Sequence, residues 1–141
     1  MKTITTESTI NASIETVWNI LSNFEAYPSW NPFIISLKGK LALGEPVQAI
    51  IVSNGKENHF KPNITVLEEG ERFEWLGKLP LGMFNGNHYF RLEKIDANTT
   101  RFIHGENFSG WLSGLILLLI RKETTRGFKA MNEALKIKAE Q

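Results

Sequence analysis

The sequence predicts an α+β domain in which several antiparallel strands precede one long C-terminal helix. Between residues 33 and 109, short apolar runs alternate with turns rich in Gly, Asn and Asp, as expected for an antiparallel sheet. Residues 110–141 contain no proline. Within that stretch, Phe128, Met131 and Leu135 recur at helical spacing among polar residues. Strands and helices segregated in this way are typical of α+β folds.

The chain should begin with a strand and two short helices. Residues 3–10 are rich in Thr and Ile, which favours a strand. Ser13 stands where a helix N-cap is expected, and residues 14–21 follow with an amphipathic helical pattern. Residues 24–30 should form a second short helix or turn, because Pro32 limits any extension.

Six further strands are expected before the long helix. Asn54-Gly55 is a strong hairpin signal, and Pro80-Leu81-Gly82 reads as a loop between two strands. The predicted strands are residues 33–37, 46–53, 57–68, 72–79, 83–95 and 100–109.

Composition narrows the function classes. A chain of 141 residues fits a single domain over 1–141 with its own core. The net charge of +1 and the scattered basic residues give no case for nucleic-acid binding. The absence of cysteine excludes thiolate chemistry and fits a reducing compartment, so we expect a cytoplasmic protein. The apolar run 111–120 is too short for a transmembrane segment, which needs roughly 20 residues.

Several segments carry a resemblance to a known family. They are residues 10–21, 24–33, 73–77, 88–90, 100–110 and 128–135. In them the sequence resembles the SRPBCC superfamily, the helix-grip fold of START domains and the birch-pollen allergen, and most closely its polyketide cyclase/dehydrase-like branch. The resemblance implies a curved antiparallel sheet of about seven strands, with two short helices and a long C-terminal helix that enclose an apolar cavity. Members bind lipids, polyketides or hormones there, and a few catalyse cyclisation.

Strand alternation predicts which side chains face such a cavity. Charged residues such as Arg72, Arg91 and Arg101 belong in solvent, so their immediate neighbours should point inward. The same alternation predicts that Val66 points inward and His59 points outward. The predicted ligand-binding residues are Trp30, Phe60, Phe73, Trp75, Phe84, His88, Phe90, Phe102, His104, Glu106, Phe128 and Met131. Trp30 has a second interpretation, in which it packs the short helices against the sheet.

Three ionisable side chains fall on the predicted inner face, where each requires a partner. Glu106, His88 and His104 are therefore the candidate catalytic residues, with a buried Glu106 of raised pKa and a neutral His acting on an enolisable ligand. They could equally hydrogen-bond one another or the polar end of a ligand. A two-His-one-carboxylate metal site lacks any ligand-spacing motif, and we predict no metal and no cofactor.

The run 115–120 is apolar all round, so one helix face cannot bury it. Leu117 and Ile120 should point inward, which leaves Leu115, Leu118 and Leu119 without an obvious partner. They could form a homodimer or other protein contact, a cavity lid or a membrane-docking surface, or they could be covered by the short helices and the 80–83 loop. Farther along, Gly127 could leave room for a ligand against the helix.

These observations favour binding of a hydrophobic or aromatic small molecule, lipid- or polyketide-like, between the sheet and the C-terminal helix. Two alternatives stay open. One is a polyketide cyclase or dehydratase that uses Glu106 with His88 or His104, although no nucleophile–base pair is visible. The other is a protein-interaction module that docks through residues 115–119.

Overall fold

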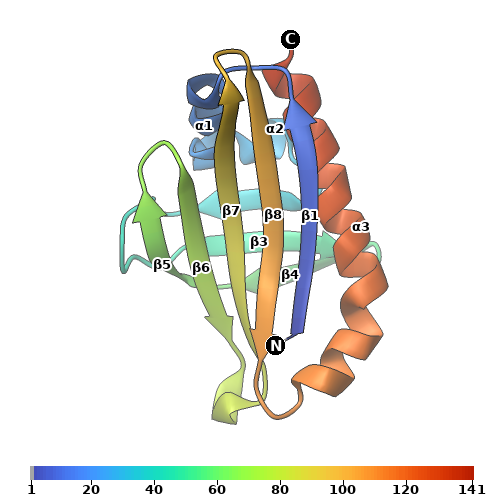
Figure 1. Cartoon of the computed structure of the whole chain (residues 1–141). Coiled ribbons are helices and arrows are strands. Elements are labelled where there is room, and N and C mark those ends of the chain that lie inside the picture. Colours follow the sequence, from blue (N-terminus) through green and yellow to red (C-terminus); the bar gives the residue numbers. More distant parts are fainter. Residues whose placement is uncertain (1) are drawn as a thin grey trace.

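The computed structural model describes residues 2–141 and consists of two antiparallel sheets with a long helix along one side (Figure 1). The strands are β1 (Lys2–Ile10), β2 (Ile34–Lys38), β3 (Gln48–Ser53), β4 (Lys56–Phe60), β5 (Asn63–Glu68), β6 (Arg72–Lys78), β7 (Asn85–Asp96) and β8 (Thr99–Ser109). The helices are α1 (Ile14–Leu21), α2 (Tyr27–Trp30) and α3 (Ser113–Ala139), with the 3₁₀ turns η1 (Phe24–Ala26) and η2 (Pro80–Gly82). The predicted α+β class is confirmed.

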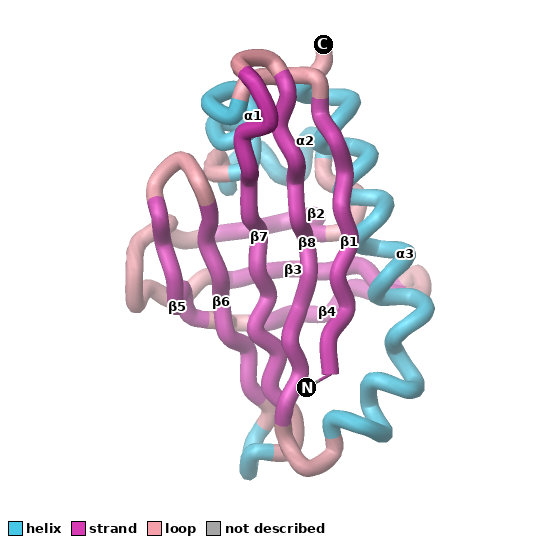
Figure 2. Tube along the Cα trace, viewed as in Figure 1, coloured by secondary structure: helices cyan, strands magenta, loops and turns pink. Residues whose placement is uncertain are grey.

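The strands form a five-stranded sheet in the order β1-β8-β7-β6-β5 and a three-stranded sheet in the order β2-β3-β4. The smaller sheet runs across the strands of the larger one behind it (Figure 2). The expected antiparallel sheet of about seven strands is thus present as eight strands in two sheets.

The extra strand arises where residues 57–68 had been expected to run as one. Proline has no N–H to donate to a strand ladder, and Pro62 ends β4 before β5 begins. The Pro62 carbonyl instead accepts a hydrogen bond from the Val47 N–H at 2.9 Å. As a result β4 and β5 belong to different sheets.

Helix α1 forms as its sequence predicts. The Ser13 hydroxyl accepts from the Thr16 N–H at 3.2 Å and caps the first turn. Val17, Trp18 and Leu21 on the apolar face are all buried. The helix therefore closes one end of the molecule, beside the C-terminal end of α3 (Figure 1).

Helix α3 begins three residues later than the sequence suggested. Gly110 has a φ of +109°, and a Cβ at this position would lie only 2.6 Å from the Met83 carbonyl oxygen. The chain can turn here because the residue is glycine. From Ser113 onward α3 presents Leu117, Phe128 and Leu135 to the core, as predicted.

One inward assignment was wrong because of a β-bulge. The β5–β6 register shifts between Ile64 and Val66, so that Ile64 lies opposite Trp75 and Val66 opposite Glu74. The extra residue reverses the alternation beyond it. Val66 consequently shares the outer face of the sheet with Glu74, and Leu67 packs against the core in its place.

Candidate functional site

The three ionisable side chains predicted to face inward do so and lie on neighbouring strands. His88 on β7 is paired with Glu106 on β8, and Phe90 is paired with His104. His88 and His104 are buried, while Glu106 is half-buried. Strand alternation therefore predicted correctly that these three side chains lie on the inner face of the large sheet, which we call the inner wall.

The two histidines contact each other directly, with 2.6 Å between their Nε2 atoms. This distance is that of a strong hydrogen bond, so one Nε2 carries a proton and the other accepts it. The separation is also too short for an ion held at about 2.0–2.1 Å from each nitrogen in a tetrahedral site. Among residues 2–141, no three His, Asp or Glu side chains are placed to share a metal ion.

Two residues that the sequence analysis had not selected complete the network. Asn132 on α3 approaches Nδ1 of His104 with its Oδ1 at 2.8 Å, and its Nδ2 donates to the Thr6 hydroxyl at 2.8 Å. The Thr6 hydroxyl donates in turn to the His104 carbonyl at 2.8 Å. A signal existed for both: Thr6 has the inward parity of Ile4 on β1, and Asn132 follows Met131 on the buried helix stripe.

This network fixes the tautomer of each ring. A carbonyl only accepts, so the Thr6 hydroxyl donates to it and must accept from Asn132 Nδ2. Asn132 Oδ1 then accepts from a protonated Nδ1 of His104. Neutral His104 therefore offers Nε2 as an acceptor to an Nε2–H of His88. The remaining ring nitrogen, Nδ1 of His88, is left as a lone pair directed at Glu106.

Burial keeps both rings uncharged. It lowers the pKa of His104 from 6.5 to about 4, partly offset by the hydrogen bond to Asn132. The pKa of His88 is also lowered well below its usual value, first by burial and then by the nearby His104. The inner wall therefore carries two neutral imidazoles at physiological pH.

Glu106 stands at the boundary between this network and solvent. Its Oε1 lies 3.8 Å from Nδ1 of His88, which is longer than a hydrogen bond. Burial raises the pKa of Glu106 to about 8, so the carboxyl is mostly protonated at pH 7. Its side chain nevertheless keeps 19% of its surface exposed. The carboxyl is thus deep in the fold yet adjoins space large enough for water.

Gly86 makes room for that carboxyl. It lies on β7 two residues before His88, and a Cβ built on it would overlap Glu106 Oε2. A side chain at this position would therefore displace the carboxyl from its place beside the imidazole.

Most of the other predicted ligand-binding residues pack closely against neighbouring side chains and line no open space. The His104 ring stacks on Phe128 at a centroid distance of 4.3 Å and the His88 ring stacks on Phe90 at 4.5 Å. Phe73 stacks on Phe90 at 4.6 Å. Six predicted ligand-binding residues have no exposed surface, so no water-sized space adjoins them: Phe73, Phe90, Phe102, His104, Phe128 and Met131.

The sequence suggested that Gly127 could leave room for a ligand against the helix, but the structure shows no such room. The Phe33 ring lies where a Cβ of Gly127 would be. Phe33 also contacts the rings of Phe128, His88 and His104, at centroid distances between 5.5 and 6.5 Å. The space that the glycine opens on α3 is therefore filled by an aromatic ring of the chain itself.

The less enclosed part of the inner face lies beyond Glu106, toward the start of α3. Phe84 is only partly buried there and stacks on Phe108 at 5.4 Å. Ile51 on β3 and Ile120 on α3 are likewise partly buried against the core. Of the predicted ligand-binding residues on the inner face of the large sheet, Phe84 and Glu106 therefore keep partial exposure.

Two other predicted residues lie apart from this region. Trp30 is partly buried and packs on Tyr27 of the same short helix with ring centroids 5.1 Å apart, and its buried indole N–H has no hydrogen-bond partner among residues 2–141. Phe60 has the parity of buried Ala49, but it is 46% exposed because β4 is an edge strand. Trp75 lies in the packed core.

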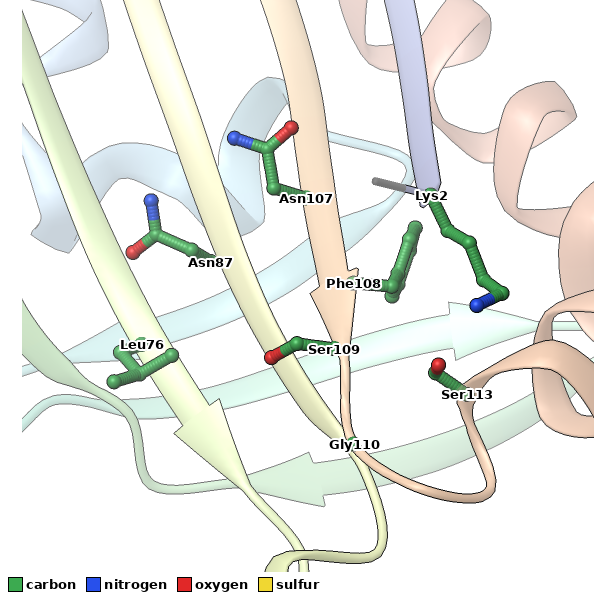
Figure 3. Close-up of a pocket in the computed structure, with 8 residues that line it drawn as sticks. All are labelled: Lys2, Leu76, Asn87, Asn107, Phe108, Ser109, Gly110 and Ser113. Carbon is green, nitrogen blue, oxygen red and sulfur yellow. The ribbon is translucent and has the colours of Figure 1, made fainter.

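Two surface hollows occur outside the inner wall. One, of about 540 Å³, lies at the end of the large sheet and contains none of the predicted ligand-binding residues (Figure 3). It is lined by Lys2, Leu76, Asn87, Asn107, Phe108, Ser109, Gly110 and Ser113. The other, of about 490 Å³, lies on the small sheet and includes Phe60 and His59. Neither contains Glu106 or a ring of the histidine pair.

Comparison with known proteins identifies the family. Residues 1–140 match the family model described as polyketide cyclase/dehydrase and lipid transport. The chain belongs to this family. None of the curated protein sequences is significantly similar to it.

Solved structures of the same superfamily share the fold at low identity. The Zhui aromatase/cyclase from Streptomyces sp. R1128 is 15% identical with a TM-score of 0.81, over 99% of this chain and 93% of that one. A START superfamily protein from Mycobacterium smegmatis is 20% identical with a TM-score of 0.75, over 99% and 97%. Ara h 8.0201 is 17% identical with a TM-score of 0.64, over 95% and 97%. At these identities the likeness establishes the helix-grip fold alone.

Proposed function

We propose that this polyketide cyclase-like domain binds a hydrophobic or aromatic small molecule, lipid- or polyketide-like, against the inner face of the sheet. The proposal depends above all on Glu106. It is a half-buried, mostly protonated carboxyl that adjoins water-sized space and lies beside a buried imidazole on a largely aromatic inner face. Apolar walls with a few oriented polar groups are typical of small-molecule sites.

The geometry around Glu106 favours a hydroxyl group at the polar end of the ligand. A protonated Glu106 donates, whereas Nδ1 of His88 accepts, and the gap between them is 3.8 Å. A hydroxyl can accept from the first and donate to the second. A carbonyl can satisfy only the carboxyl, and a carboxylate would face the lone pair of His88. A phenol or enol is therefore the expected group.

The apolar part of the ligand would lie along Phe84, which is partly buried and stacks on Phe108. Burial of its apolar surface should contribute roughly 25 cal/mol per Å². The rings around Phe128 are fully buried, so they would have to move before a ligand could reach them.

Displacement of a neutral fluorescent probe, N-phenyl-1-naphthylamine, would test the proposal. Unlabelled 2-naphthol should compete about tenfold better than 2-methoxynaphthalene, which cannot donate to His88. In Glu106→Leu both competitors should bind more weakly, because each accepts a hydrogen bond from the carboxyl, while the probe still binds. Absence of probe uptake by the parent protein, or equal competition by both naphthalenes, would refute it.

A second function, acid–base catalysis on an enolisable ketone, is favoured by the pKa of about 8 at Glu106. Glu106 would donate its proton to the carbonyl oxygen while Nδ1 of His88 removes a proton from the adjacent carbon. The products are an enol, a carboxylate and an imidazolium, and return of one proton from His88 to Glu106 restores the site. Both groups lie on adjacent strands in suitable protonation states.

Exchange of the α-protons of 2-tetralone in D₂O separates catalysis from binding. Under the catalytic hypothesis the protein accelerates exchange and Glu106→Gln loses at least about 100-fold of that acceleration. If the domain only binds, exchange stays at the buffer rate and Glu106→Gln changes only the affinity for 2-naphthol.

A further inference from the structure

One end of the molecule exposes a group of large apolar side chains that the small-molecule site does not use. We call Leu81, Trp111, Leu115, Leu118 and Leu119 the apolar tip. These side chains are between 58% and 87% exposed. Of the alternatives for the leucines, coverage by the short helices and the 80–83 loop does not occur, because Leu115, Leu118 and Leu119 are exposed and Leu81 of that loop is exposed as well.

Hydrogen bonds join the two segments that build the tip. The Trp111 indole N–H donates to the Leu81 carbonyl at 3.2 Å, and the Leu112 N–H donates to the Met83 carbonyl at 2.9 Å. Leu81 itself has a φ of +60°, a conformation that leucine rarely adopts. The turn therefore holds its most exposed apolar side chain outward at a backbone cost.

The tip continues along one face of α3. Leu115, Leu118 and Leu119 follow Trp111 at helical spacing on the side opposite buried Leu117. Together with η2, this start of α3 forms the end of the molecule that projects away from α1 and the C-terminus (Figure 1). A projecting apolar end is better suited to insertion into a soft surface than to a flat protein interface.

The charge around the tip is positive. No Asp or Glu occurs in residues 75–92 or 107–122, the two segments that build and flank it. Lys78 precedes η2, while Arg121 and Lys122 follow the exposed leucines. Lys2 extends from β1 toward the first turn of α3 (Figure 3). Within the described chain, 2–141, none of these four cations forms an ion pair.

We propose that the apolar tip docks the domain on the surface of an anionic lipid bilayer. Trp111 and the leucines enter the interfacial layer, and the surrounding Lys and Arg side chains contact lipid phosphates. This combination of apolar and cationic groups matches an anionic membrane better than a neutral one. In residues 2–141, no helix is long and apolar enough to cross a membrane, so the contact is peripheral.

Co-sedimentation of the full chain with vesicles tests this docking. Binding to phosphatidylcholine vesicles containing a quarter phosphatidylglycerol should exceed binding to pure phosphatidylcholine at least about tenfold, and added salt should reduce the difference. Equal partitioning into both vesicles, or into neither, would overturn the proposal.

Two matched variants locate the contact. Leu118→Glu/Leu119→Glu should reduce binding to the anionic vesicles at least about tenfold. Ile137→Glu is the control, since Ile137 is 56% exposed between Lys136 and Lys138 at the other end of the same helix. It should change binding less than about twofold. Equal losses in both variants would overturn the assignment to the tip.

A charge variant tests the contribution of the cations, and a measurement of the oligomeric state tests self-association through the tip. Lys78→Glu/Lys122→Glu leaves the leucines intact, and it should abolish the preference for anionic vesicles even if the leucine variant folds poorly. Sedimentation velocity without lipid should give a monomer for the parent. A dimer that Leu118→Glu/Leu119→Glu dissociates would overturn membrane docking in favour of self-association.

Discussion

The two halves of α3 show that apolar content alone does not determine burial. The first half begins with eight residues, 113–120, of which six are apolar, yet Leu115, Leu118 and Leu119 are exposed. The second half is mixed in composition, yet Phe128, Met131 and Leu135 are completely buried. The difference lies in the opposing surface, because the second half packs on β1, β8 and α1 while the outer face of the first half meets solvent.

This contrast separates two roles within one helix. The second half completes the core and, through Asn132, orients the imidazoles of the inner wall. The first half presents its leucines outward. Stability should therefore depend on the second half, and interactions with other molecules should depend on the first.

The largest expected effect comes from comparing one substitution in each half. Phe128→Ala should lower the free energy of unfolding by about 3–5 kcal/mol, because it removes a buried ring that packs on three others. Leu118→Ala should change it by less than about 0.5 kcal/mol, because that side chain is exposed. Urea denaturation measures both values. Similar losses would mean that the first half is also buried in solution.

Glu106 should give the next largest effect, with a defined pH dependence. Its pKa is about 8 in the folded chain and 4.5 in the unfolded chain, so the folded state binds the proton more tightly between these values. Stability therefore falls as pH rises through that window. Glu106→Gln removes this loss. Its free energy of unfolding should exceed that of the parent by about 3 kcal/mol at pH 7 but by little at pH 4.5. A difference that does not change with pH in urea titrations would contradict the protonated carboxyl.

Asn132 should show that the second half of α3 controls the histidine tautomers. Asn132→Leu removes the acceptor for Nδ1–H of His104 and should cost about 1–3 kcal/mol. ¹⁵N NMR of the imidazole nitrogens should then show that His104 no longer holds its proton solely on Nδ1. Asn132→Asp is the control: it keeps the acceptor, and its charge should raise the pKa of His104 above about 4. An unchanged NMR spectrum in the leucine variant would show that Asn132 does not fix the tautomer of His104.

The smallest effects come from the two glycines inside α3. Gly114→Ala meets nothing closer than Lys2 Cε at 3.5 Å and should gain up to about 1 kcal/mol from helix propensity. Gly127→Ala gains the same propensity but collides with the Phe33 ring, and should lose about 1 kcal/mol net. Thermal denaturation of the pair measures the sign of each change. A stabilised Gly127→Ala would mean that Phe33 is free to move.

Periodicity predicted much of this structure because it reports on burial. The inward parity of His88, His104 and Glu106 follows from alternation with charged neighbours, and the stripe around Phe128 follows from helical spacing. The Val66 assignment failed because a bulge inserts one residue and reverses alternation without a local signal. The division into two sheets was missed for a related reason: Pro62 was visible, but the change of sheet depends on tertiary pairing.

The candidate site was predictable only in part. Which residues face inward is a local property of each strand. Whether they line space or fill it depends on contacts between distant segments, such as the Phe33 ring against Gly127. The hydrogen bonds from Asn132 to His104 and Thr6 join α3, β8 and β1, and no spacing rule connects three such distant positions.

The pairing of the first strand with the last has a consequence for how the chain folds. Thr3 on β1 hydrogen-bonds to Asn107 on β8 across 104 residues of sequence, and α3 packs on both strands. Contacts of such high sequence separation slow folding, because a long loop must close before they form. During synthesis β1 must therefore wait for its partner until β8 has been made. Until β8 is present, the backbone N–H and C=O groups that β1 directs at it have no strand partner, and such unpaired strand edges are prone to aggregation.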